Sequence, residues 1–99
     1  MSKKILVIRF SSIGDIVLTT PVLRGLHQQT GAEVHVLTKP AFALILEHNP
    51  HVAKIHTLTP DIGEVISELK KENFDEIIDL HHNLRSQRIK LALGKKATS

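Results

Sequence analysis

The sequence predicts an α/β domain in which helices cover both faces of a parallel sheet. Short apolar or β-branched runs alternate with helical patterns four times along the 99 residues, in the order βαβαβαβα. Strands that alternate with helices are joined by right-handed crossovers, and such crossovers make the sheet parallel. The first run, residues 5–8, is apolar throughout, as in a strand that is buried on both faces. Hydrophobic residues make up 41% of the chain, which argues against disorder.

Size and composition predict one domain over residues 1–99. A chain this short buries a modest share of its surface, so we expect it to gain stability from a neighbouring part. The absence of cysteine excludes disulfides and thiolate metal sites. The first apolar run is too short for a signal peptide and no segment reaches transmembrane length, which predicts a cytoplasmic protein. With three Phe and no Trp or Tyr, the chain lacks the exposed rings of a nucleic-acid-binding surface.

The first half of the chain continues with a helix, a strand and a short helix. Apolar residues between positions 16 and 26 indicate the first helix, and Gly31 is typical of a helix end. Within it, Thr20 followed by Pro21 has the form of an N-cap with a first-turn proline, so we expect a kink or a new helix start there. Residues 33–37 alternate and predict the second strand. Pro40 then opens a short helix.

The second half predicts a weaker strand over residues 52–58 and then the clearest helix. Asp61 begins that helix in the manner of a capping box, and its apolar residues recur with the spacing of one helical stripe. Residues 75–80 predict the fourth strand, after which Asn83 caps a last helix.

We expect no further strand after Lys95. The architecture therefore looks cut, and we expect the chain to be the front part of a longer enzyme.

Two loops fall where ligands bind in such sheets, at the carboxyl ends of the strands. The loop after the first strand contains Ser11, Ser12, Gly14 and Asp15. Asp15 could act there as a general base, or it could cap the helix that follows. A single glycine matches neither the G-x-G-x-x-G fingerprint nor the Walker loop, which excludes a dehydrogenase and a P-loop kinase. A response-regulator receiver needs an acidic pair after this strand, where the chain has residues 9–11 instead.

The loop after the fourth strand contains two adjacent histidines and a second set of polar residues. His81 and His82 point apart and have no acidic partner at a fixed spacing, so we predict no metal site. Asn83, Arg85 and Ser86 begin a helix, where N–H groups and a guanidinium favour phosphate or carboxylate. The basic residues of this end suit an anionic ligand or a membrane surface, or simply a solvated helix face; they are Arg85, Arg88, Lys90, Lys95 and Lys96.

Residues 4–23, with S-S-I-G-D at their centre, resemble the opening of the glycosyltransferase family 9 enzymes, the ADP-heptose:lipopolysaccharide heptosyltransferases. Residues 79–86 resemble the second N-terminal signature of the same family, which more often has Gln-Gly in place of His81 and His82. The two motifs occur in the family's order, and the resemblance runs over nearly the whole chain.

The resemblance implies a GT-B enzyme, in which two Rossmann-like domains face each other across a cleft. The N-terminal domain, to which residues 1–99 would belong, binds the lipopolysaccharide inner core on lipid A. The missing C-terminal domain binds ADP-heptose. The reaction would transfer heptose to a sugar hydroxyl with inversion, without a cofactor or catalytic metal, and at the inner face of the inner membrane.

The resemblance also implies roles for the site residues. Asp15 falls on the proposed catalytic base, while Ser11, Ser12 and Gly14 shape its loop. Arg85, with Arg88, Asn83 and Ser86, would bind acceptor phosphates or carboxylates. The alternative is a stand-alone α/β module that binds anions or sugars without catalysis.

Overall fold

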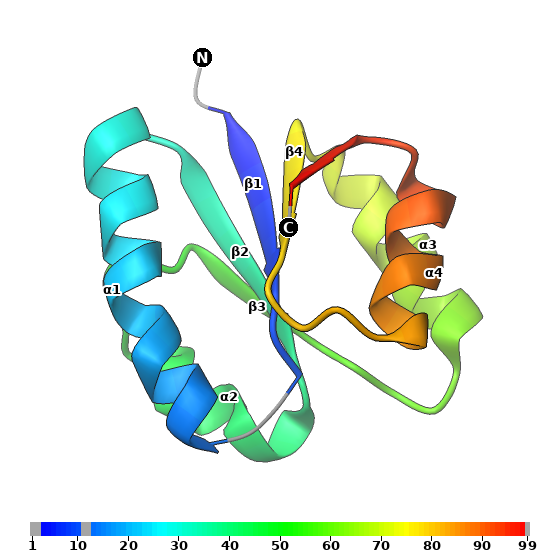
Figure 1. The fold of residues 1–99 in the computed structure, drawn as a ribbon, viewed down its shortest axis with the longest axis horizontal. Coiled ribbons are helices and arrows are strands. Elements are labelled where there is room, and N and C mark those ends of the chain that lie inside the picture. The colour runs from blue at the N-terminus through cyan, green and yellow to red at the C-terminus, as the bar shows by residue number, and fades with distance from the viewer. Residues whose placement is uncertain (1–2, 11–12, 99) are drawn as a thin grey trace.

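The computed structural model describes residues 3–10 and 13–98, which form a five-stranded parallel sheet with helices on both faces (Figure 1). The predicted α/β fold is therefore confirmed. In chain order the elements are β1 (Lys4–Ile8), α1 (Ile13–Thr30), β2 (Glu33–Thr38), α2 (Pro40–Glu47), β3 (Lys54–Thr57), α3 (Ile62–Glu72), β4 (Glu76–Asp79), α4 (Leu84–Leu93) and β5 (Lys96–Thr98). No helix among the described residues is long and apolar enough to cross a membrane.

The strand order is β3-β2-β1-β4-β5, so the chain builds the sheet outward from β1 in two directions. It first adds β2 and β3 on one side and then crosses back to add β4 on the other. Each neighbouring pair is parallel, and β1 is in register with both β2 and β4. The reversal of direction between β1 and β4 is the topological switch point, where sheets of this class open a crevice beyond the carboxyl ends of the strands.

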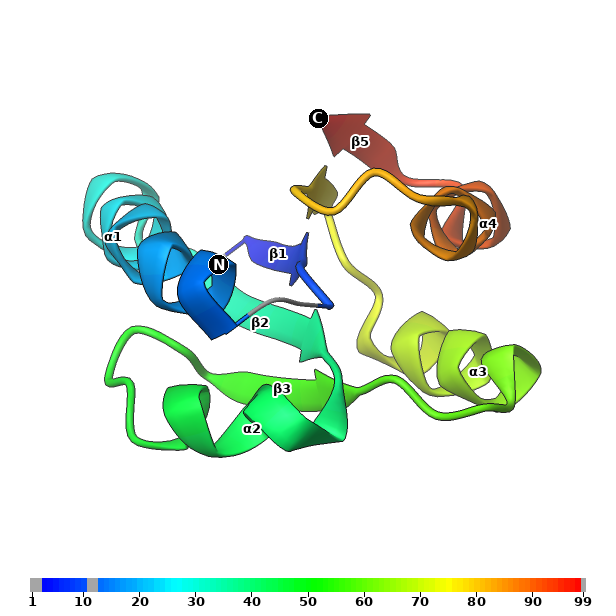
Figure 2. The same cartoon turned by 60° about the horizontal axis from the view of Figure 1, so that its bottom comes forward.

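Two hydrophobic cores lie on opposite faces of the sheet. Alternate residues of β1 point into different cores, with Leu6 and Ile8 on the α3 and α4 side and Ile5 and Val7 on the α1 side. Figure 2 shows α1 and α2 on one face and α3 and α4 on the other. Because helices cover both faces, β1 is apolar at every buried position, which is the pattern that its sequence displays.

The strand β5 corrects the expectation that none follows Lys95. Lys96–Thr98 pairs parallel with β4, and its first residue lies opposite Glu76. Three residues with one small apolar side chain carry no strand periodicity, so the sequence gives no signal here. The unpaired edge of β4 supplies the hydrogen-bonding groups that order these residues.

The helix α1 corrects a second expectation, because it runs through Pro21 without a new start. Proline lacks the N–H that would bond to the carbonyl of Val17. The hydroxyl of Thr20 donates to that carbonyl instead, at 2.8 Å. Thr20 is therefore not an N-cap, and its side chain supplies the donor that the proline removes. The predicted end of the helix is confirmed, because Gly31 adopts a left-handed φ of 66°.

The other helix ends follow the sequence closely. Asp61 caps α3 by accepting a hydrogen bond from the Glu64 N–H at 3.1 Å. Asn83 caps α4, which ends at Gly94. The third strand is shorter than predicted and covers Lys54–Thr57.

Candidate functional site

The two sequence motifs meet at the carboxyl edge of the sheet because β1 and β4 are neighbours. The Leu80 N–H continues the strand pairing by donating to the Ile8 carbonyl at 3.0 Å. Just beyond, the Phe10 N–H donates to Nδ1 of His81 at 3.4 Å, and the two rings lie 4.7 Å apart between centroids. Both loops lie at the carboxyl edge, as predicted, and the strand order makes them neighbours.

Arg9 joins the two loops to the start of α1. Its Nη2 lies 2.8 Å from Oδ2 of Asp15, and its Nη1 donates a hydrogen bond to the carbonyl of Leu80. The arginine side chain is 23% exposed, whereas the Asp15 side chain is 45% exposed. The less exposed Arg9 guanidinium therefore orients the Asp15 carboxylate, which solvent can still reach.

Asp15 lies in the first turn of α1, two residues after the helix begins at Ile13. It is therefore not the N-cap residue, although its charge still favours the positive end of the helix dipole. The neighbouring Gly14 is exposed, and no heavy atom of the described residues lies within 4 Å of the position that a Cβ would take there. The remaining residues of the predicted loop, Ser11 and Ser12, lie outside the described residues.

A cavity of about 500 Å³ lies along the same edge of the sheet. It has the size of a small-molecule site. Two cations, Lys39 after β2 and Arg85 at the start of α4, contribute to its wall. Arg85 also lies over the Phe10 ring, with Cζ 5.6 Å from the centroid. The described residues that line it include no acid; they are Lys39, Pro40, Ala41, Leu58, Thr59, Pro60 and Arg85.

Lys39 is a residue that the sequence interpretation missed. Its signal was its position two residues after the predicted strand 33–37, where side chains reach the carboxyl edge. Together Lys39 and Arg85 make this cavity suitable for an anion.

Asn83 and Ser86 form a capping box at the start of α4. The Ser86 N–H donates to Oδ1 of Asn83 at 2.8 Å, and the Asn83 N–H donates to the Ser86 hydroxyl at 2.9 Å. Ser86 is fully buried. Arg88 is exposed and lies one turn beyond Arg85 on the same helix. The ligand-binding roles of all these residues remain predictions.

Asp79 shapes the loop that carries His81 and His82. Its buried Oδ1 accepts hydrogen bonds from the N–H groups of both histidines, at 2.9 and 3.0 Å. Its Oδ2 lies 3.1 Å from Nζ of Lys90. Burial alone would raise the pKa of Asp79, but these hydrogen bonds outweigh it and the pKa is lowered.

His82 adopts a left-handed φ of 57°, a conformation that favours glycine. Burial, followed by the nearby charge of Arg9, lowers the pKa of His81. Neither histidine belongs to a cluster of metal ligands among the described residues; one such cluster lies elsewhere, at His35, His56 and Glu72.

The known proteins to which this chain is similar agree with the resemblance of its motifs. No family model matches the sequence. The chain is 26% identical to lipopolysaccharide heptosyltransferase 1 of Campylobacter coli, over 93% of this chain and 29% of that protein. Among solved structures, a family 9 glycosyltransferase from Veillonella parvula superimposes with a TM-score of 0.87 and 22% identity, over 96% of this chain and 31% of that one.

A second structure, the ADP-heptose lipopolysaccharide heptosyltransferase II of E. coli, gives a TM-score of 0.82 at 22% identity, over 93% of this chain and 28% of that one. The chain thus spans about a third of the length of the proteins that it matches. Over that part it is similar in sequence to a lipopolysaccharide heptosyltransferase and shares the fold of glycosyltransferase family 9, as its motifs predicted.

Proposed function

We propose that this chain is the acceptor-side part of a glycosyltransferase that moves heptose from ADP-heptose to the lipopolysaccharide inner core. The observation that carries the proposal is the Arg9–Asp15 pair, which places a solvent-accessible carboxylate at the switch point of the sheet. The similarity to named heptosyltransferases supports the choice of sugar and acceptor. One related structure, the E. coli heptosyltransferase WaaC, is described with ADP-2-deoxy-2-fluoro heptose, an analogue of such a donor.

Asp15 acts as the general base in the proposed reaction. It removes the proton of the acceptor hydroxyl as that oxygen bonds to the anomeric carbon of heptose. The bond from that carbon to the diphosphate breaks on the opposite side, ADP leaves with the bonding electrons, and the configuration inverts. Arg9 keeps the carboxylate oriented before proton transfer and remains tied to Leu80 afterwards.

The cavity beside Arg85 binds the negative charges of the acceptor. The inner core on lipid A carries phosphates and carboxylates, and Lys39 and Arg85 supply complementary charge. Arg88 and Asn83 extend this surface along α4, whereas Ser86 supports it through the helix cap. Ser11, Ser12 and Gly14 shape the loop beside the base.

The donor binds to a second domain of a GT-B enzyme, outside residues 1–99. The length of the matched relatives, about three times that of this chain, leaves room for such a domain. We place the enzyme in the cytoplasm, with its acceptor site toward the inner face of the inner membrane. The formal net charge of +3 favours contact with such an anionic surface.

The test is heptose transfer by the full-length protein to a lipopolysaccharide acceptor that lacks heptose. Asp15→Asn keeps the shape of the side chain but removes the proton acceptor, so kcat should fall by about 10²–10⁴-fold with little change in Tm. Asp61→Asn is the matched control, because Asn caps a helix as well as Asp does and Asp61 lies on α3. Near-normal kcat for Asp15→Asn would refute the catalytic assignment.

The alternative is a stand-alone binding module. It predicts that residues 1–99 bind anionic sugars by themselves, and that a longer protein containing them does not transfer heptose. The similarity of the chain to transferases argues against this alternative.

A further inference from the structure

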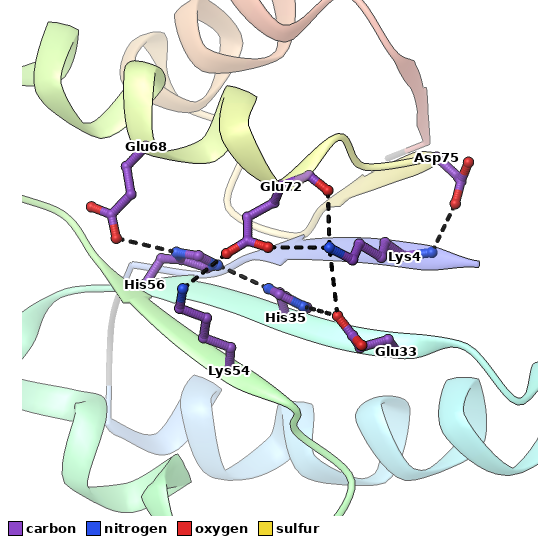
Figure 3. Close-up of polar contacts among 8 residues, drawn as sticks. All are labelled: Lys4, Glu33, His35, Lys54, His56, Glu68, Glu72 and Asp75. Carbon is purple, nitrogen blue, oxygen red and sulfur yellow. Dashed lines mark hydrogen bonds and ion pairs between the residues drawn. The ribbon is translucent and has the colours of Figure 1, made fainter. Parts of the chain in front are cut away.

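Two buried histidines lie side by side on the sheet face that α3 covers. His35 on β2 is 2% exposed and His56 on β3 is 3% exposed. Their rings stack with 5.2 Å between centroids and 16° between planes, and Phe74 packs edge-on against both. The pair lies toward the amino ends of the strands, because Lys4 and Glu33, which begin β1 and β2, take part in the same network (Figure 3). It is therefore separate from the candidate site at the carboxyl edge.

The partners of the two rings determine where their protons lie. Nε2 of His35 lies 2.7 Å from Oε2 of Glu33, which only accepts, so His35 donates from Nε2. Nδ1 of His35 is then an acceptor, and Nε2 of His56 donates to it at 2.9 Å. Nδ1 of His56 is left without a proton or a hydrogen-bond partner among the described residues, 3.8 Å from Oε1 of Glu68. A buried lone pair thus faces a carboxylate, which is an unfavourable arrangement.

Glu72, at the end of α3, adds a carboxylate to the pair. Potential ligand atoms of His35, His56 and Glu72 all lie within 4.8 Å of one another. A hydrogen bond from Lys54 is the main reason that the pKa of Glu72 is lowered to about 2, so the group is ionised at neutral pH. Burial, followed by the neighbouring His35, lowers the pKa of His56, so its ring is neutral. Glu72 and His56 are therefore in the ionisation states that metal ligands need.

We propose that His35, His56 and Glu72 form a binding site for a divalent metal ion such as zinc. Two imidazoles and one carboxylate are a ligand set that zinc prefers, and water can fill a fourth position. The ion takes the place of the proton that Nδ1 of His35 and Nε2 of His56 now share. Two nitrogens on one tetrahedral zinc ion lie roughly 3.3 Å apart, so the pair needs to open by only about 0.4 Å.

Glu33 and Glu68 orient the two rings from outside. When the ion binds, the proton of His56 moves from Nε2 to Nδ1, from which the ring can donate a hydrogen bond to the Glu68 carboxylate. His35 keeps its Nε2–H on Glu33, so neither ring loses its proton. Each histidine then donates to a carboxylate on the side away from the ion, as metal-bound histidines commonly do. The orphaned nitrogen of His56 gains a partner in the same step.

Two lysines compete with the ion for Glu72. Nζ of Lys54 lies 2.9 Å from Oε2 and Nζ of Lys4 lies 3.2 Å from Oε1. One carboxylate oxygen must exchange an ammonium group for the ion, and this competition weakens binding. Since the ligands come from β2, β3 and α3, a bound ion joins the helix to the sheet and stabilises the folded chain.

The test is zinc binding by the metal-free protein, measured in competition with a chromogenic chelator. We expect one zinc ion per chain, and cobalt in its place should give the visible absorption of a four-coordinate site. Glu72→Gln should weaken zinc binding by at least roughly tenfold. Removal of a group that only hydrogen-bonds to a metal ligand already causes a loss of this size. Lys54→Met should tighten binding, because it removes a competing cation from Glu72.

His48→Gln is the matched control, because His48 is an exposed histidine at the end of α2. Its affinity for zinc should equal that of the unmodified protein. Absence of stoichiometric binding would overturn the proposal, and so would affinity that falls in His48→Gln but not in Glu72→Gln. Both Glu72→Gln and Lys54→Met leave the buried histidines intact, and no readout depends on heptose transfer.

Discussion

Arg9 and Asp15 form an ion pair at 2.8 Å that connects the end of β1 to the first turn of α1. The same guanidinium donates to the carbonyl of Leu80, after β4. One side chain thus fixes three segments at the switch point of the sheet. The position of the proposed base depends on this contact as well as on its own helix.

Arg9 should act through Asp15 and not by itself. Arg9→Gln in the full-length protein should lower kcat by about 10- to 100-fold, the equivalent of one charge-assisted hydrogen bond of about 1.5–3 kcal/mol. In an Asp15→Asn background the same change should cost little, because residues that act as a unit are not additive. A double-mutant cycle on kcat, with Tm for each variant, measures this. Independent, multiplicative losses would show that Arg9 has a separate role.

Lys39 and Arg85 should contribute to acceptor affinity. Lys39→Ala and Arg85→Ala should each raise the KM for the acceptor by about tenfold or more and leave the KM for ADP-heptose unchanged, because each removes a cation from the cavity wall. Arg24→Ala is a control that removes a cation lining a different cavity. A rise in the donor KM alone would place these residues on the donor side of the cleft.

Asp79 should make the chain sensitive to acid. Its folded pKa lies below the ordinary value of 3.8, so its contribution to stability is present above pH 4 and is lost as the pH falls through the folded pKa. Asp79→Asn should cost roughly 3 kcal/mol at pH 7, because Lys90 loses a buried partner. Unfolding by urea at pH 7 and pH 3 measures both effects.

The difference in stability between the unmodified protein and Asp79→Asn should shrink at the lower pH. Asp75→Asn is the control. Asp75 is exposed, so this substitution should cost little unfolding free energy. A difference that stays constant with pH would contradict the role given to the charge of Asp79.

Thr20 should stabilise α1 only because Pro21 follows it. Thr20→Val removes the donor to the Val17 carbonyl and should cost about 0.5–1 kcal/mol of unfolding free energy. In a Pro21→Ala background the cost should be smaller, because the N–H of residue 21 can then bond to Val17. Chemical denaturation of the four variants tests the coupling, and equal costs in both backgrounds would exclude it.

Local patterns in the sequence were sufficient to predict most of the helices and strands. The apolar run of β1, the cap at Asp61, the cap at Asn83 and the end of α1 at Gly31 depend on neighbouring residues and on backbone preference, so they could be predicted. The alternation of strands and helices also placed both candidate loops at the carboxyl edge. Lys96–Thr98 could not be predicted, because its order comes from pairing with β4 and not from its own side chains.

The tertiary structure alone decided which side chains meet. Asp15 has two possible roles from its sequence position, but its pairing with Arg9 depends on how α1 leaves the sheet, which no local pattern determines. Lys39 and Arg85 lie far apart in sequence and share a cavity only because of the strand order. His35, His56 and Glu72 have no metal-binding spacing, and the sequence predicted no metal site. Their convergence arises from strand register and from the packing of α3, which are long-range properties that no local pattern encodes.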